Sequence, residues 1–557
     1  MNTTEQRITR TEAISHTGMV NSKHPLAAQA GLDVLKAGGN AVDAAITTAL
    51  AQGVVEPMMS GIGGGGFMVF HEAKTGLTHV LDYFMRAPHG ATPDMYEIVQ
   101  AGAVNVLGYG GVKDDANATG YRSIGVPGLL AGAQMALDRF GTIPLARALE
   151  PAIDLAENGF DPGWHHMLHS AQHMDLLARH PATAKVFLRE GGLVHRAAGM
   201  TPGDKVIQRD LARTLKRVAA QGEREFYEGE TARMIATDFS AHGNLINEAD
   251  LRSYAPAWRT ARSTDYRNYK LLFAPSTGGS TLAETFNILE GFRFDGLSAN
   301  DADTLHLFIE AARIAYADRY AWLADERDPG VPFGMLESKA YATARRAGIK
   351  NDTAAGAVPA WNGEPIASAN DDGTCTTHLS VIDRERNMVA LTQTINAVWG
   401  SGVTVEGTGV LFNNTMVLFD PVPGRKNSIA AGKYPLSSMT PALVLKNGLP
   451  FMSAGAPGGR QIMGTVMRTI HNVIEFGLNA ADACAYIGFD SSAPKTIIDA
   501  DLGDDVIANL RARGHALDAR AKSIYPRLFA SPTVIVVDGD QLRGGADPYH
   551  LGVALGF

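Results

Sequence analysis

Two threonines and a histidine stand directly before a predicted strand in GTCTTHLSVID, residues 373 to 383. A threonine hydroxyl is a weak nucleophile at neutral pH and needs an adjacent base. An N-terminal threonine carries such a base in its own α-amino group, whose pKa is about 8. Self-cleavage of the Cys375–Thr376 bond would therefore make Thr376 nucleophile and base together. Taken alone, the two threonines also suit the ordinary start of a β-strand.

The run GIGGGG at residues 61–66 fits the spacing GxGxxG through Gly61, Gly63 and Gly66. A dinucleotide site requires these glycines to open a helix whose N-terminus faces the pyrophosphate. Here FMVFHEA follows, which is typical of a strand. We therefore expect a tight backbone turn beside the core or an active-site wall, and no nucleotide cofactor.

A second group of residues could bind a metal. His165, His169 and His173 are four residues apart and would share one face of a helix. The chain has no HExxH motif, and no carboxylate clearly completes the set. A solvated or partly buried helix face is the simpler interpretation, and we expect no metal. The serine-acylase motif GxSxG is also absent.

The elements that would position Thr376 follow from the periodicity. Apolar spacing predicts two helices within residues 25–53, further helices within 128–160, and one over 302–325. Residues 351–375 have the composition of a mobile segment, and strands THLSVID, MVALTQTI, GVLFNN and ALVLKNG follow. Cleavage at Thr376 would give a helix-rich large subunit, 1–375, and a small subunit, 376–557, which together form one composite domain.

Composition narrows the class of protein. The chain has 557 residues, 45% of them hydrophobic, and a formal charge of −9, which argues against nucleic acid as a partner. No apolar stretch suits a signal peptide or a membrane span, so we expect a cytoplasmic protein without a membrane partner. Its two cysteines, Cys375 and Cys484, are expected to remain reduced.

Several separated blocks resemble the γ-glutamyltranspeptidase family in the family's order. They are HPLAAQAGLDVLKAGGNAVDAA, GIGGGGFMVF, GVPGLLAG, TTHLSVID, PLSSMTPALV and GAPGGRQI, with a weaker match at GGADP. The resemblance implies an α/β fold of the N-terminal-nucleophile (Ntn) hydrolase type, a four-layer αββα sandwich matured by self-cleavage into large and small subunits. It also implies an amide substrate and an acyl-enzyme.

The resemblance also implies roles for single residues. Thr376 would be the nucleophile, Thr394 would orient it, and Gly458 and Gly459 would lie in the oxyanion hole. The residues that would hold the acyl group are Asn396, Ser437 and Ser438. Glycine suits the oxyanion turn because its backbone can approach the substrate closely.

Two positions depart from the family's pattern. Phe84 stands where an arginine would bind the substrate α-carboxylate, with Arg86 two residues later. Leu418 stands where an aspartate would bind the α-amino group, and Thr415 occupies a position that is often glutamine. A buried ammonium without a carboxylate partner is costly, so Leu418 disfavours a free α-amino group.

We therefore expect an acylase that removes a glutaryl- or aminoadipyl-type side chain, similar to the cephalosporin acylases of the family. Arg86 would help Ser437 and Ser438 to bind the acyl carboxylate. The segment 420–434 is shorter than a substrate-covering lid, which would admit a bulky amine. The alternatives are a γ-glutamyltransferase or glutathione hydrolase, and a hydrolase of small amides of the oxamate type.

Overall fold

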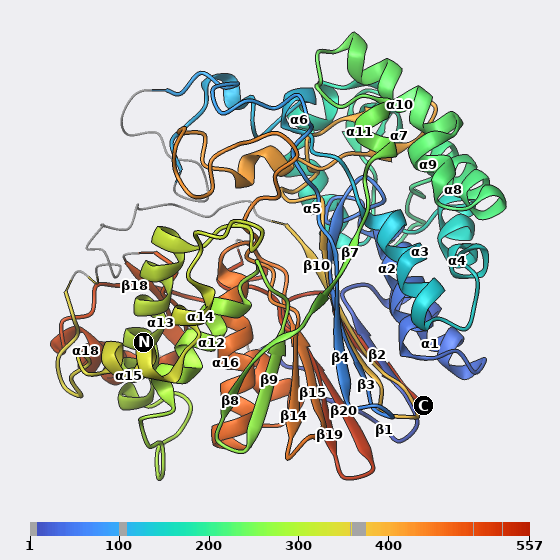
Figure 1. Cartoon of the computed structure of the whole chain (residues 1–557). Helices are drawn as coiled ribbons and strands as arrows, with labels where there is room; N and C mark the ends of the chain where they lie inside the picture. The colour runs from blue at the N-terminus through green and yellow to red at the C-terminus, as the bar shows by residue number, and fades with distance from the viewer. Residues whose placement is uncertain (1–7, 100–108, 357, 359–374, 494, 526) are drawn as a thin grey trace.

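Two seven-stranded antiparallel sheets stack against each other in the computed structural model, which describes residues 8–99, 109–356, 358, 375–493, 495–525 and 527–557 (Figure 1). The first sheet runs in the order β1 (Ala13–Ser15), β20 (Gln541–Ala546), β19 (Thr533–Asp538), β15 (Leu449–Gly455), β14 (Ala442–Lys446), β9 (Tyr269–Phe273) and β8 (Arg262–Tyr266). The second runs in the order β21 (Val553–Gly556), β2 (Met19–Ser22), β10 (Thr377–Ile382), β11 (Met388–Thr394), β3 (Gly65–Glu72), β4 (Leu77–Tyr83) and β7 (Ala257–Thr260).

Helices cover the outer face of each sheet, as Figure 1 shows. The first sheet is covered by α12 (Gly279–Leu289), α13 (Ala302–Trp322) and α16 (Gln461–Phe476). The second is covered by α1 (Pro25–Lys36), α2 (Ala41–Val55), α3 (Leu129–Phe140) and α4 (Leu145–Asn158). Strand β10 packs against β15 and β19 across the sheet interface. The predicted four-layer αββα sandwich is confirmed.

The predicted helices are present, although α2 continues to Val55 and α13 ends three residues before the predicted boundary at 325. Residues 25–53 form α1 and α2, which are separated by Gly38 at φ +95° and by Asn40. Asn40 caps α2 by accepting from the backbone N–H of Asp43, whose side chain accepts from the N–H of Asn40 in return. Helices α3 and α4 lie within residues 128–160, and α13 ends at Trp322.

The strands differ in part from the prediction. THLSVID, MVALTQTI and ALVLKNG form β10, β11 and β14, but GVLFNN contributes only the two-residue strand β13 (Val410–Leu411), paired with β12 (Thr404–Val405). The helix-rich first part also supplies β2, β3 and β4, so residues from both sides of Thr376 form one sheet. Most of the predicted mobile segment, residues 359–374, lies outside the described residues.

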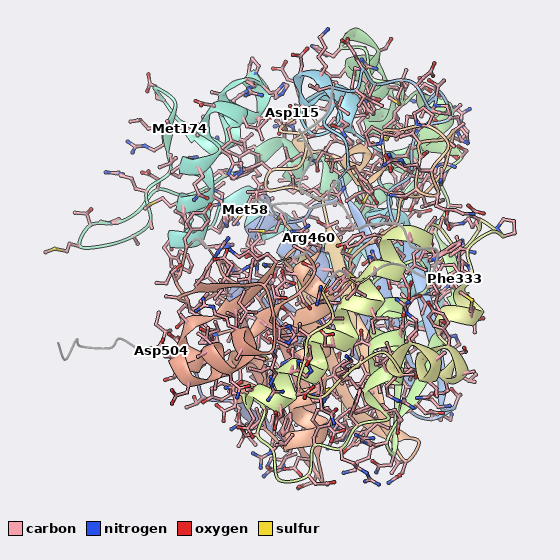
Figure 2. All side chains as sticks on the ribbon, turned by 90° about the vertical axis from the view of Figure 1, so that its left-hand side faces the viewer. Met58, Asp115, Met174, Phe333, Arg460 and Asp504 are labelled. Carbon is pink, nitrogen blue, oxygen red and sulfur yellow. The ribbon has the colours of Figure 1, made fainter. Side chains whose placement is uncertain are left out.

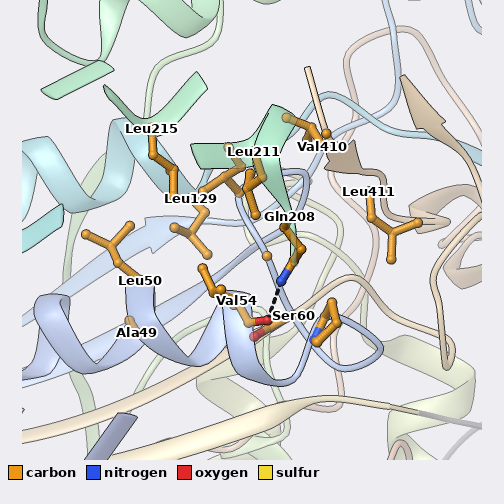
Figure 3. Close-up of a pocket in the computed structure, with 15 residues that line it drawn as sticks. Ala49, Leu50, Val54, Ser60, Leu129, Gln208, Leu211, Leu215, Val410 and Leu411 are labelled. Atoms are coloured by element: carbon orange, nitrogen blue, oxygen red, sulfur yellow. Dashed lines mark hydrogen bonds between the residues drawn. The ribbon is translucent and has the colours of Figure 1, made fainter. Parts of the chain in front are cut away.

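A small apolar cavity of about 20 Å³ lies between α2, α3, α8 (Arg209–Gln221) and β13 (Figure 3). Leu50, Val54 and Leu129 line it, and Gln208 Nε2 donates to the carbonyl O of Val54 at 2.8 Å. Its volume suits about one water molecule, so it is a packing gap rather than a substrate site. Among the described helices, none combines the length and apolar character needed to cross a membrane.

Candidate active site

Thr376 lies directly before β10, next to the end of β11. The antiparallel register pairs Thr377 with Gln393, which brings Thr376 beside Thr394. The two hydroxyl oxygens are 3.2 Å apart, and the Thr394 hydroxyl donates to the carbonyl O of Cys375 at 2.7 Å. The Thr376 hydroxyl contacts the same carbonyl oxygen. Two threonine hydroxyls from adjacent strands thus converge on the carbonyl oxygen of one peptide bond.

Cys375 is held firmly on the other side of that bond. Its N–H donates to the carbonyl O of Asn396 at 2.9 Å, and its thiol donates to the carbonyl O of Met58 at 2.9 Å. Burial raises the pKa of the thiol, so it stays protonated and is not a competing nucleophile. Met58 lies near the middle of the molecule, beside Arg460 and below Asp115 in the side view of Figure 2.

A cavity of about 440 Å³, here called the acyl cavity, opens on one side of Thr376. Its lining includes six of the residues predicted for the site: Thr394, Asn396, Leu418, Ser437, Ser438 and Gly459. Asn396 has a positive φ of 76°, its N–H donates to Thr394 Oγ1 at 2.8 Å, and its Nδ2 donates to Thr415 Oγ1 at 2.9 Å. Thr415 is fully buried and therefore acts by orienting Asn396.

The lining of the acyl cavity combines apolar side chains with hydroxyl groups. Leu418, Val417 and Met439 form an apolar wall, and Ser437 and Ser438 supply hydroxyls. Among the described residues that line it there is no lysine or arginine, and its one carboxylate is the exposed Asp115. Sequence reasoning missed Asp115, since no motif connects a residue of a surface turn with Thr376.

The glycine pair lies in the turn between β15 and α16, with φ of +139° at Gly458 and +58° at Gly459. A Cβ on Gly458 would lie 2.6 Å from the Cβ of Ala530 and 2.7 Å from Nη2 of Arg527, so a larger residue does not fit. Gly459 lines the acyl cavity, while Gly458 lines a second cavity on the other side of Thr376. The two glycines of this turn therefore line two different cavities that both reach Thr376.

The prediction that Phe84 and Arg86 belong to the substrate-binding residues is wrong, because neither residue lines a cavity at Thr376. Phe84 follows β4 into the core between the sheets and stacks on Phe67 with ring centroids 5.1 Å apart. Arg86 Nη2 donates to the carbonyl O of Asp250 at 3.1 Å and to Ser253 Oγ at 2.8 Å. The guanidinium is thus directed away from the acyl cavity.

The second cavity has a volume of about 580 Å³ and is here called the amine cavity. It shares Cys375, Thr376, Val398 and His173 with the acyl cavity. Sequence reasoning missed it because its walls come from distant segments, α5 (Trp164–Gln172) and residues within 520–525 and 527–528. The three spaced histidines His165, His169 and His173 lie in this wall.

These histidines form no metal site with other side chains of the described chain. His165 Nε2 and His169 Nε2 are 3.1 Å apart, and His165 Nδ1 is 3.6 Å from the buried Glu56 carboxylate. Burial lowers the pKa of His169 to about 3, assisted by the nearby Lys23, so the imidazole is neutral. The expectation of a partly buried helix face fits this geometry.

The glycine run has a packing role at the same site. A Cβ on Gly64 would lie 2.2 Å from the carbonyl O of Thr394, and one on Gly63 would lie 2.2 Å from that of Leu411. Strand β3 follows the run, so these glycines open no helix. They allow the backbone to pack tightly against the end of β11, which fixes Thr394.

Comparisons with known proteins agree with this geometry. The family model described as Gamma-glutamyltranspeptidase matches residues 27–557. The chain is 37% identical over 536 residues to the Acylase ACY 1 proenzyme of Pseudomonas sp. (strain V22), covering 96% of this chain and 92% of that one. It is 33% identical over 552 residues to the Glutathione hydrolase proenzyme of Escherichia coli (strain K12), covering 95% and 90%.

Among solved structures, a cephalosporin acylase from Bacillus halodurans superposes with a TM-score of 0.85 at 28% identity, covering 100% of this chain and 98% of that one. The similarity of the fold and the similarity of the sequence over nearly the whole chain agree with each other. The chain belongs to the gamma-glutamyltranspeptidase family and is an Ntn-type amide hydrolase or acyltransferase.

Proposed function

We propose that the chain cleaves its own Cys375–Thr376 bond and matures into subunits 1–375 and 376–557. The contact of the Thr376 hydroxyl with the Cys375 carbonyl supports this proposal, because attack there moves the Cys375 acyl group from nitrogen to oxygen. Thr394 would stabilise the developing oxyanion through its hydrogen bond to the same oxygen. Breaking of the C–N bond in this shift frees the Thr376 amine, and water then hydrolyses the ester to give the Cys375 carboxylate and the free Thr376 hydroxyl.

In the mature enzyme the α-amino group of Thr376 takes the hydroxyl proton as Oγ1 attacks the substrate amide. The Gly458–Gly459 turn would supply backbone N–H groups for the tetrahedral oxyanion. The protonated α-amino group then returns the proton to the leaving amine, and water releases the acyl group by the same steps. An amine in place of water would give acyl transfer.

The substrate that the geometry favours carries a glutaryl-type acyl group on a bulky amine, as in glutaryl-7-aminocephalosporanic acid. The observation that carries this proposal is Leu418 in the acyl cavity, since an α-ammonium buried against an apolar wall loses its hydration without gaining a partner. Ser437 and Ser438 would hydrogen-bond the acyl carboxylate. Buried Arg319, which donates to the Ser437 carbonyl at 2.7 Å, places positive charge behind them.

A glutathione hydrolase is the second candidate, and Asp115 is the observation that favours it. This carboxylate lines the acyl cavity and is exposed, so it could meet a γ-glutamyl ammonium without complete desolvation of either ion. The similarity to the Escherichia coli glutathione hydrolase proenzyme points the same way. An aminoadipyl side chain would use the same contact.

The test compares kcat/KM for glutaryl-4-nitroanilide and γ-glutamyl-4-nitroanilide, which differ by the α-amino group, in one cleaved preparation. We expect the wild-type enzyme to prefer the glutaryl substrate by roughly tenfold or more, the cost of one unpaired ammonium. Leu418→Asp should shift the ratio toward γ-glutamyl, whereas Leu418→Asn controls for polarity without charge. A wild-type preference for γ-glutamyl that Asp115→Asn removes would establish the second candidate instead.

A further inference from the structure

The amine cavity differs from the rest of the molecule in the sign of its charges. The chain carries a formal charge of −9, but the described residues that line this cavity include two arginines and no aspartate or glutamate. The arginines are the half-buried Arg527 and the exposed Arg520. The acyl cavity has the opposite character, with one carboxylate and no cation among its described lining residues.

Arg527 lies next to the reacting centre. Its Nη2 would lie 2.7 Å from a Cβ on Gly458, and its Nη1 donates to Ser531 Oγ at 3.2 Å. Its charge acts on the cavity wall, where it adds to burial and to the nearby Lys23 in lowering the pKa of His165. Arg527 also interacts with the carboxylate of Asp547, and both residues line a small neighbouring cavity, so the arginine lies between this cavity and the amine cavity.

Arg520 lies at the rim, where its guanidinium is 2.7 Å from the Asp518 carboxylate in an exposed ion pair. Such a pair is weak because water screens both charges, so Arg520 can exchange this partner for an incoming anion. Trp164 and Tyr525 also line the cavity and offer ring faces to a flat or bulky group. The cavity thus combines an inner cation, a rim cation and aromatic walls.

Resting on the proposed function, we propose that the amine cavity binds the leaving amine of the substrate and selects amines that carry a carboxylate. An amide bond placed at Thr376 with its acyl part beside Leu418 directs its nitrogen substituent toward Gly458 and Arg527. A carboxylate a few bonds from the scissile nitrogen then meets Arg527, where a charge-assisted hydrogen bond forms. Amino acids and bicyclic β-lactam amines share this chemistry.

The experiment compares two amides with the same acyl group and different leaving amines, 4-aminobenzoate and 4-aminobenzamide. The two amines have similar size, but only the first is anionic. The carboxamide withdraws electrons more strongly than the carboxylate, so leaving-group ability alone would favour the benzamide. We expect wild-type kcat/KM to favour the benzoate by roughly tenfold or more, and Arg527→Gln to reduce this preference to near one. Arg527→Lys should retain part of it, and Arg520→Gln should reduce it by a few fold, roughly the effect of a rim charge.

Arg511→Gln is the matched control, because Arg511 is an exposed arginine of α18 (Asp504–Ala512) that lines neither cavity. Equal hydrolysis of both amides by the wild-type enzyme, or a preference that survives both arginine-to-glutamine changes, overturns the inference. If Arg527→Gln does not fold, two other measurements test the inference. The preference for the benzoate substrate should be smaller in Arg520→Gln, and in the wild-type enzyme it should decrease as the salt concentration rises.

Failure of the proposed function would be distinct. It would appear as no hydrolysis of either anilide, the benzoate or the benzamide, with a glutaryl or a γ-glutamyl acyl group. Calorimetry with the free amines then tests the cavity without turnover. Binding of 4-aminobenzoate that is no tighter than binding of 4-aminobenzamide overturns the inference, and tighter binding that Arg527→Lys retains better than Arg527→Gln supports it. A natural amino acid and a β-lactam amine compared in the same titration distinguish the two sources of the carboxylate.

The two amines can also be offered as acceptors to the acyl-enzyme. An amine that attacks the acyl-threonine occupies the same cavity as one that leaves, because the two steps are the reverse of each other. We therefore expect 4-aminobenzoate to divert more acyl groups from hydrolysis to transfer than 4-aminobenzamide does at equal concentration. Equal partition ratios for the two acceptors would contradict the assignment.

Discussion

Replacing Thr394 with valine tests how the chain activates the Cys375–Thr376 bond. The change keeps the shape of the side chain and removes three contacts: the hydrogen bond to the Cys375 carbonyl at 2.7 Å, the contact with the Thr376 hydroxyl at 3.2 Å, and the acceptor for the Asn396 N–H at 2.8 Å. The first contact decides the rate. When Thr376 Oγ1 becomes bonded to the Cys375 carbonyl carbon, it no longer donates to that oxygen, whereas Thr394 still does.

Loss of one preorganised donor to a developing oxyanion slows acyl transfer by roughly 10²–10³-fold, or about 2.7–4 kcal/mol. We expect self-cleavage of Thr394→Val to slow by this factor. The unpaired Asn396 N–H adds a stability cost of about 1–3 kcal/mol, which is a separate effect. Thr394→Ser keeps the hydroxyl and should restore most of the cleavage rate.

The assay follows the conversion of the full-length chain into two fragments on denaturing gels after a pulse of cell-free synthesis. Thr392→Val is the matched control, because Thr392 lies on the same strand, is fully buried, and bonds His378 Nδ1 at 2.8 Å instead of Cys375. Both valine variants lose a buried hydrogen bond of β11. Equal slowing in the two would assign the effect to folding, and cleavage of Thr394→Val at the wild-type rate would refute the oxyanion role.

Two further predictions concern the same strands. Thr376→Ala should remain a single chain and lack amide hydrolysis, while Thr376→Ser should cleave; two fragments of the natural sizes from the alanine variant would contradict the nucleophile assignment. His378 is fully buried, and burial lowers its pKa to about 3 from an ordinary 6.5. Between these two pH values the unfolded state binds more protons than the folded state. The free energy of unfolding therefore falls as the pH decreases from 6.5 toward 3. The slope approaches about 1.4 kcal/mol per pH unit for this residue, and His378→Gln should flatten the pH dependence of the melting temperature in circular dichroism.

The sandwich and the pairing of Thr376 with Thr394 followed from the resemblance to the family, whereas the individual helices and strands were predicted because they depend on local signals. Capping at Asn40, the apolar period of α13 and the alternation in β10 are all visible within a few residues. Phe84 was misplaced because its position was assigned by matching a motif. The end of β4 then turns into the core between the sheets, and no local signal reports that direction.

The amine cavity was missed for a related reason. Arg527 lies against Gly458 only because residues within 520–525 and 527–528 lie beside the turn between β15 and α16, and that placement depends on long-range packing. The acidic Asp115 likewise enters the acyl cavity from a distant turn. Periodicity can identify the strands that carry a nucleophile, but the walls around it come from segments with no shared pattern.

The position of Thr376 between two cavities explains how one set of reacting groups can serve different amides. The hydroxyls of Thr376 and Thr394 come from the ends of adjacent strands of one sheet, and the Gly458–Gly459 turn follows β15, the central strand of the other. None of these groups touches the ends of the substrate. Leu418 on one side and Arg527 on the other can therefore change independently of the chemistry, so acyl specificity and amine specificity should respond separately to substitution. Leu418→Asp combined with Arg527→Gln should then change the two substrate preferences additively, because the side chains face different cavities.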